Sequence, residues 1–322
     1  MLFGSGGVGK LTPGQEPPRV TGMSPIFGVH GGLQNTTVEE LRGLWARAEE
    51  LDFDWISVWD HFYAAGPEDY HCHEAVTMHA ALACSTSRVR CGCLVYCAGY
   101  RHPAVLAKAV ATIDQLSGGR ADIGLGAGWA QPEYAAFGFP FPSAGKRLDL
   151  LEEAAACVRG LLRDEVTDYD GQHFQLRQAH LEPRPVQAAL PIWIGGAGER
   201  RTLRIAARYA DGWNVPYISP EDFARKRKVL AEHCDAEGRD ASEIRCAINL
   251  GISTDDESLR AQFGPIAEFV RPGVLMGQGQ ELVDRVGEYL TAGADQVNIV
   301  LRAPWDLSLL DLAAEAIAPH RS

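Results

Sequence analysis

Residues 100–129, YRHPAVLAKAVATIDQLSGGRADIGLGAGW, contain a helix, a turn and a strand in succession. Pro103 suits the first position of the helix, and apolar residues recur at helical spacing as far as Leu116. Gly118 and Gly119 provide a left-handed stop. A strand is predicted over 121–125. Such a unit is typical of folds in which helices and parallel strands alternate.

This predicted strand carries a row of glycines. Gly124, Gly126 and Gly128 fall on one face for as long as the chain stays extended. Glycine weakens a strand, so a row of glycines favours the close approach of a flat group to the backbone. A crowded barrel interior that needs small residues is the alternative, and the pattern leaves both open.

The same alternation extends through residues 24–318 and predicts one domain. Eight strands, each followed by a helix, indicate an α/β fold, a single (β/α)8 TIM barrel with loop insertions. A doubly wound open sheet is the alternative, but it would leave more edge strand. Strands are expected at 26–29, 55–59, 89–95, 121–125, 192–195, 212–215, 244–252 and 296–300. Helices are expected at 37–51, 74–83, 103–116, 146–162, 199–209, 220–237, 281–292 and 309–317.

Two irregular stretches interrupt the alternation. The first, 163–191, contains two short β-runs joined by a turn, and we expect it on the loop side that follows the strands or as an outer lid. The second, 255–278, has no clear pattern. Neither stretch indicates a domain boundary.

The composition restricts the class of protein. A chain of 322 residues with 46% hydrophobic content can bury a large core, and its net charge of −12 argues against nucleic acid or an anionic membrane as a partner. Residues 1–23 have no signal-peptide core and predict a disordered leader. The eight cysteines show no framework spacing, which favours reduced thiols in a cytoplasmic enzyme and no metal site.

Barrel enzymes carry their active residues where strands end, and the second predicted strand ends with Asp60 and His61. An imidazole titrates near neutral pH, so His61 is the candidate for acid–base catalysis. A hydrogen-bonded core histidine is the alternative. The carboxyl-end position and the neighbouring aspartate favour the functional interpretation.

The fifth predicted strand ends with Gly196, Ala197 and Gly198, directly before a helix. Backbone N–H groups that are free at such a point bind phosphate, and the helix dipole adds to the attraction. Arg200 and Arg201 would oppose that dipole unless an anion lies nearby. A surface helix whose arginines pair with acidic neighbours is the alternative.

Four segments together resemble a known family. The segments are FDWISVWDHFY at 53–63, CGCLVYCAGYRHPAVLAKAVATIDQLSGGRADIGLGAGW at 91–129, LPIWIGGAGERRTLRIAARYADGWN at 190–214 and AGADQVNIVL at 292–301. From residue 24 to residue 317, the chain resembles the bacterial luciferase-like monooxygenase superfamily. Within it, the chain is most similar to the branch of oxidoreductases that depend on a deazaflavin, coenzyme F-420.

The resemblance implies a cofactor stretched across the carboxyl-terminal mouth of the barrel. Asp60 and His61 would flank the reacting ring, and His61 would exchange a proton with the substrate or the cofactor. The Cys93–Leu94 bond matches the place where several relatives hold a non-proline cis peptide. Gly126 and Gly128 would let the ring lie close to the backbone.

At the other end of the cofactor, the resemblance implies that the N–H groups of Gly196, Ala197 and Gly198 hold its phosphate. A neighbouring arginine, Arg201, would help. The family also implies a homodimer and a partner reductase that supplies reduced cofactor. The substrate would be a small organic molecule of apolar or conjugated character.

The sequence departs from relatives that oxidise sugar phosphates. Ala127 stands where they carry an acidic residue, and their tryptophan after the Asp-His pair is absent, which argues against sugar-6-phosphate oxidation. An FMN-dependent monooxygenase on the same barrel is the nearer alternative. A phosphate-handling lyase or isomerase without a redox cofactor is more distant, since that class binds phosphate after the seventh and eighth strands. A cofactor-binding protein without catalysis is a further alternative.

Overall fold

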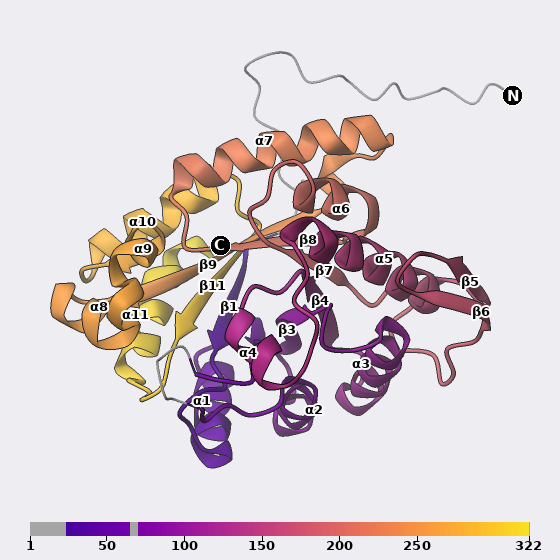
Figure 1. Ribbon diagram of the computed structural model, residues 1–322. Coiled ribbons are helices and arrows are strands. Elements are labelled where there is room, and N and C mark those ends of the chain that lie inside the picture. Colours follow the sequence, from indigo (N-terminus) through magenta and orange to yellow (C-terminus); the bar gives the residue numbers. More distant parts are fainter. Residues whose placement is uncertain (1–23, 65–69, 322) are drawn as a thin grey trace, which may run out of the picture.

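The computed structural model describes residues 24–64 and 70–321, so the predicted leader lies outside the described residues (Figure 1). Eight parallel strands pair in the order β1-β2-β3-β4-β7-β8-β9-β11, and β11 pairs with β1 to close a barrel. This closed ring confirms the TIM barrel and excludes the open sheet. The strands are β1 (Ile26–Gly31), β2 (Trp55–Val58), β3 (Arg90–Cys97), β4 (Ala121–Gly126), β7 (Ile192–Gly195), β8 (Gly212–Pro216), β9 (Arg245–Ser253) and β11 (Gln296–Leu301).

Helices surround the barrel and cover its strands from outside, as Figure 1 shows. Their apolar faces and the outward residues of the strands form one continuous core. The longer helices are α1 (Val38–Glu50), α2 (Ala75–Ser85), α3 (Pro103–Ser117), α5 (Ala144–Arg163), α6 (Thr202–Tyr209), α7 (Pro220–Glu237), α8 (Asp256–Phe263), α10 (Gln280–Thr291) and α11 (Ser308–Ile317). Two shorter helices are α4 (Gln131–Ala136) and α9 (Ala267–Val270).

The stretch 100–129 folds as its pattern predicts. Pro103 occupies the first turn of α3, and Gly118 ends the helix with a φ of 66°. The eight predicted strands are all present, with ends displaced by at most two residues. The helix expected at 199–209 begins only at Thr202, so Arg201 precedes the helix and is not in its first turn.

Both irregular stretches contain defined structure. The two β-runs form an antiparallel hairpin of β5 (Thr167–Asp170) and β6 (Gln175–Ala179). The hairpin follows α5 in the chain and leads into β7, so it lies toward the amino-terminal end of the barrel. It packs against the outside of α5 (Figure 1). The expected position on the opposite loop side is therefore wrong. In the second stretch, α8 and α9 lead to a short strand, β10 (Val274–Met276), that pairs with the carboxyl-terminal end of β9.

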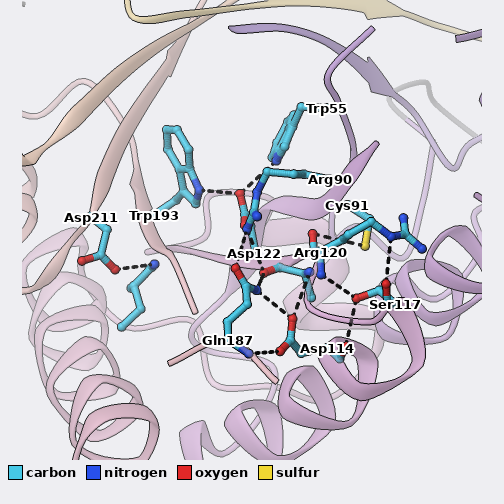
Figure 2. Close-up of polar contacts among 12 residues, drawn as sticks. Trp55, Arg90, Cys91, Asp114, Ser117, Arg120, Asp122, Gln187, Trp193 and Asp211 are labelled. Atoms are coloured by element: carbon cyan, nitrogen blue, oxygen red, sulfur yellow. Dashed lines mark hydrogen bonds and ion pairs between the residues drawn. The ribbon is translucent and has the colours of Figure 1, made fainter. Parts of the chain in front are cut away.

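The amino-terminal end of the barrel is closed by hydrogen-bonded polar side chains (Figure 2). The buried carboxylate of Asp122 accepts hydrogen bonds from the indole N–H groups of Trp55 at 2.9 Å and Trp193 at 3.2 Å, and it pairs with Arg90. Asp114 accepts two hydrogen bonds from Gln187 nearby. A buried charge with several donors is compensated, so this end of the barrel serves stability.

Candidate functional site

The carboxyl ends of the strands meet at the mouth of the barrel, and β3 bulges there. Its pairing with β4 shifts register between Cys93 and Tyr96. The non-proline cis peptide is Leu94–Val95, one bond later than the predicted Cys93–Leu94 bond. The family resemblance located the cis peptide at the correct end of β3. It missed the bond by one position, within the bulge where β3 has one residue more than β4.

The glycine row receives the side chain of Val95. A Cβ atom at Gly126 would collide with Val95 Cγ2, and one at Gly195 would come within 2.6 Å of Val95 Cγ1. Gly128 lies beyond the strand with a φ of 75°, against Tyr134 and Cys97. The small residues therefore serve first to pack the barrel interior. Val95 itself is only half-buried.

His61 belongs to a hydrogen-bonded array of three residues at this mouth. Its Nδ1 lies 2.7 Å from Glu133 Oε1, and the Tyr100 hydroxyl donates to Glu133 Oε2 at 2.7 Å. An ionised carboxylate only accepts hydrogen bonds, so Nδ1 must carry the proton toward Glu133. In the neutral ring, Nε2 is then a proton acceptor, and within the described residues it has no partner.

Glu133 is held in its ionised form by these neighbours. Its position is buried, which raises the pKa of the carboxyl group. The hydrogen bond and charge of His61 and the hydroxyl of Tyr100 outweigh that effect, and the net pKa lies below the usual value. Glu133 comes from α4, which follows the glycine row, and the sequence analysis did not single it out.

Aromatic side chains surround His61. Trp129 is 72% exposed and meets the imidazole edge-on, with ring centroids 5.4 Å apart. Phe62, the residue after His61, meets the Phe137 ring at a tilt of 31°, with ring centroids 4.5 Å apart. An exposed tryptophan beside a half-buried histidine is available to a flat ligand, because indole faces stack well on planar rings.

Asp60 points away from this array into the protein. Its carboxylate accepts two hydrogen bonds from Arg101, at 2.6 and 3.0 Å, and one from the Cys97 N–H at 2.9 Å. Burial raises its pKa, while Arg101 and the Cys97 N–H act in the opposite direction. Asp60 therefore joins the ends of β2 and β3, and its assigned place beside a reacting ring stays a prediction.

The loop after β7 has the geometry of an anion site. The Trp213 indole and Lys226 Nζ donate to the carbonyls of Gly196 and Ala197, both at 2.9 Å. The carbonyls are thus turned inward and held, while Ala197 and Gly198 are exposed. In the part of the chain that the structure describes, the N–H groups of Ala197 and Gly198 have no acceptor, whereas the third predicted donor, the Gly196 N–H, already donates to the Asn214 carbonyl at 2.9 Å.

Arg201 is engaged elsewhere. Its guanidinium donates to Asp149 Oδ1 at 2.7 Å and to the Gly145 carbonyl at 2.9 Å, and Glu152 of α5 lies at 3.4 Å. Arg204 also pairs with Glu152. These contacts are those of an outer helix with acidic neighbours, so the role of Arg201 at a phosphate stays a prediction without support from this geometry.

A second histidine lies at the mouth and was not considered in the sequence analysis. His30 ends the inward face of β1, with Nδ1 2.6 Å from Ser57 Oγ and its ring 4.9 Å from that of Trp59. Burial lowers its pKa to about 3, so the ring is neutral at physiological pH. The period-two alternation of β1 could have identified it, since Gly28 and His30 share one face.

Comparison with known proteins identifies the family. The model of the luciferase-like monooxygenase family matches residues 19–263. The chain belongs to this family. An uncharacterized protein of Mycobacterium tuberculosis is 32% identical over 215 residues, covering 67% of this chain and 72% of the relative.

Named relatives and structures agree with this assignment. An F-420-dependent glucose-6-phosphate dehydrogenase of Kineococcus radiotolerans is 32% identical, covering 67% of this chain and 64% of the relative. An F-420-dependent secondary alcohol dehydrogenase, solved with an F-420–acetone adduct, superposes with a TM-score of 0.83 at 21% identity, covering 93% of this chain and all of the other. The superposition supports the barrel fold.

Proposed function

We propose that this chain is an F-420-dependent oxidoreductase that transfers hydride between the deazaflavin and a small organic substrate. The array of His61, Glu133 and Tyr100 carries the proposal, because it presents at the mouth of the barrel a ring nitrogen that has no partner among the described residues. Hydride transfer to or from a carbonyl, imine or activated alkene needs a matching proton transfer. The F-420-dependent relatives support the choice of cofactor.

The mouth suits the two ends of such a cofactor. The N–H groups of Ala197 and Gly198 would hold the phosphate, and the ring would lie toward Trp129 and the Leu94–Val95 bulge. When bound, the deazaflavin supplies a hydride donor or acceptor. The phosphate contact would come from backbone groups, since the nearby arginine is already paired.

The protein's own groups would manage the proton. Glu133 keeps the proton of His61 on Nδ1 and stabilises the imidazolium when Nε2 is protonated. The Tyr100 hydroxyl fixes the second carboxylate oxygen, so Glu133 cannot rotate away. Trp129 would cover the imidazole and reduce the access of water once a ligand stacks on it.

The remaining features follow the family. We propose a homodimer and a separate reductase or dehydrogenase that restores the cofactor, together with a cytoplasmic location. Among residues 24–64 and 70–321, no helix is long and apolar enough to cross a membrane.

An FMN-dependent monooxygenase remains the second candidate, because the matching family includes monooxygenases. A phosphate loop built from backbone N–H groups would bind FMN equally well. Reduced FMN activates oxygen, whereas the deazaflavin transfers only hydride. The phosphate-handling lyase is less well supported, since the glycine loop follows the fifth barrel strand, β7.

Titration of the purified protein with oxidised F-420 and, separately, with FMN tests the proposal. Quenching of the ligand fluorescence should report micromolar binding of F-420, with FMN weaker by about a hundredfold, or close to 2.7 kcal/mol. The reverse preference would establish the monooxygenase. Failure of both ligands to bind would refute both redox functions and favour the lyase.

A further inference from the structure

Arg302 stands out among the cations at the mouth. Arg101, Arg201 and Lys226 each pair with a carboxylate. Arg302 directly follows β11 and has no hydrogen bond and no ion pair within residues 24–64 and 70–321. Its guanidinium lies over the Phe263 ring, 5.7 Å from the ring centroid. It is nevertheless half-buried. A cation that gives up part of its hydration without a counter-ion indicates a missing anionic ligand.

The alternation of β11 places Arg302 on the inner side of the barrel. Asn298 donates to Asn249 Oδ1 at 2.9 Å on the neighbouring strand β9, and it faces inward because Val297 and Ile299, on the other face of β11, belong to the core under the helices. Counting by two leads from Asn298 to Arg302. The Gly32 N–H donates to the Leu301 carbonyl, which places Arg302 beside the end of β1.

Aromatic rings lie near Arg302. The Phe263 ring of α8 contacts the guanidinium but is only 3% exposed, and a Cβ atom at Gly251 on the inner face of β9 would touch it at 3.0 Å. Tyr217, which is half-buried, meets Phe263 edge-on at 5.7 Å. Beyond the end of β1, the half-buried Trp59 ring lies against Gly32. One cation with half-buried aromatic rings nearby suits a planar group that carries a single negative charge.

Most of this sector is separate from the parts of the mouth assigned to the cofactor. His61, Trp129 and Gly198 follow β2, β4 and β7, whereas Tyr217 and Arg302 follow β8 and β11. β8 and β11 both pair with β9, which lies opposite β3 in the ring, but Trp59 follows β2 and β8 adjoins β7, so the two sites meet there. A substrate bound there would approach the cofactor from the side that His61 leaves open.

We propose that Arg302 recognises the carboxylate of a planar, aromatic or conjugated substrate that lies between the half-buried rings of Tyr217 and Trp59, while the buried Phe263 ring supports the guanidinium. This inference rests on the proposed function for the reaction itself, but not for the binding. A bidentate contact with guanidinium matches a carboxylate and excludes the neutral amide of the same shape. One unpaired cation fits a monoanion better than a phosphate dianion.

The experiment compares acids with their amides. Benzoate and trans-cinnamate are titrated against benzamide and cinnamamide, by calorimetry, with the protein both free of F-420 and saturated with it. The acids should bind about tenfold tighter than the amides. Arg302→Gln should abolish this preference, Arg302→Lys should retain part of it, and Arg42→Gln, an exposed and unpaired cation on α1, should leave it unchanged.

Each contrary outcome has a distinct meaning. Equal binding of acids and amides, no binding of either acid, or an undiminished preference in Arg302→Gln overturns the inference. Phenyl phosphate that binds tighter than both acids would overturn the choice of a carboxylate. If Arg302→Gln weakens F-420 itself by tenfold or more, the anion belongs to the cofactor. If F-420 does not bind at all while the acid preference persists, the proposed function fails and the assignment of Arg302 stands.

Discussion

The two ends of the barrel use polar side chains in opposite ways. At the amino-terminal end, the buried Asp122 has three donors around it, and the side chains in Figure 2 satisfy one another, although the buried Gln296 Oε1 has no hydrogen-bond partner among the described residues. At the carboxyl-terminal end, His61 Nε2, the N–H groups of Ala197 and Gly198, and the Arg302 guanidinium have no hydrogen-bond or ion-pair partner within the described residues.

This difference separates stability from function. Polar groups that are paired within the protein lower the free energy of the folded state, whereas unpaired groups at an open mouth are available to ligands. Parallel strands direct all their carboxyl ends to one rim, so loops and binding groups gather there while the other rim can be closed by packing. Substitutions at the two ends should therefore affect different measurements.

The largest effect is expected at the closed end. Asp122→Ala would leave Arg90 without its partner and two buried indole N–H groups without an acceptor, and should lower the free energy of unfolding by about 3–5 kcal/mol. Urea denaturation measures this change, with the exposed Asp235→Ala as control. Turnover per folded molecule should stay within about twofold. A stable variant with reduced turnover would contradict the division between the two ends.

At the open end, Gly198→Glu should prevent cofactor binding. The new carboxylate would place negative charge where the exposed N–H groups of Ala197 and Gly198 await a phosphate, so affinity should fall by about a hundredfold or more. Fluorescence titration measures it. Gly43→Glu on α1, where an added Cβ meets no atom within 4 Å, is the matched control. Normal cofactor affinity in Gly198→Glu would remove this loop from the site.

Loss of the imidazole should affect turnover alone. His61→Ala should retain cofactor affinity and lower turnover by at least about tenfold, because the group that exchanges the proton is gone. Steady-state kinetics with any accepted substrate measures this, and the exposed His180→Ala serves as control. Glu133→Gln should lower turnover less and change its pH profile, since an amide no longer fixes the tautomer. Unchanged turnover in His61→Ala would refute its role.

Per pH unit, the smallest expected effect concerns acid stability. Burial lowers the pKa of His30 to about 3 and that of His79 to about 4. Between pH 6.5 and these values, the two imidazoles are protonated in the unfolded chain but neutral in the folded protein. The free energy of unfolding should fall as the pH drops from 6.5 to 4, by up to about 1.4 kcal/mol per pH unit for each histidine. Replacing His30 by Gln should reduce this slope, and His180→Gln should not. Parallel curves would contradict the assigned burial.

Much of the fold could be predicted from local pattern. Helix 103–116 has a proline start, an apolar face and a glycine stop within a few residues, so each signal acts on its immediate neighbours. The hairpin within 163–191 was recognised by its turn but placed on the wrong side, although the order of helix 146–162, hairpin and strand 192–195 already indicates the side from which strands begin. The start of α6 was misplaced because distant Lys226 and His233 hold the preceding loop.

The candidate site was predicted only in part. Single residues with distinctive chemistry, such as His61 and the glycines of 196–198, could be proposed from their places after strands. Their partners could not, since Glu133 lies far along the chain from His61 and shows no pattern of its own. The same holds for the contact of Asp60 with Arg101, which joins the ends of two strands and which no local pattern indicates.

Local sequence thus specifies the strands, the helices and their alternation along the chain, because periodicity and capping depend on neighbours along the chain. Whether a polar group is paired or free depends on contacts between segments remote in sequence. In the folded barrel Arg201 pairs with Asp149, whereas Arg302 has no ion-pair partner among the described residues, although both are arginines that follow strands. Only the tertiary structure could make that distinction, since pairing is a property of the space around a side chain.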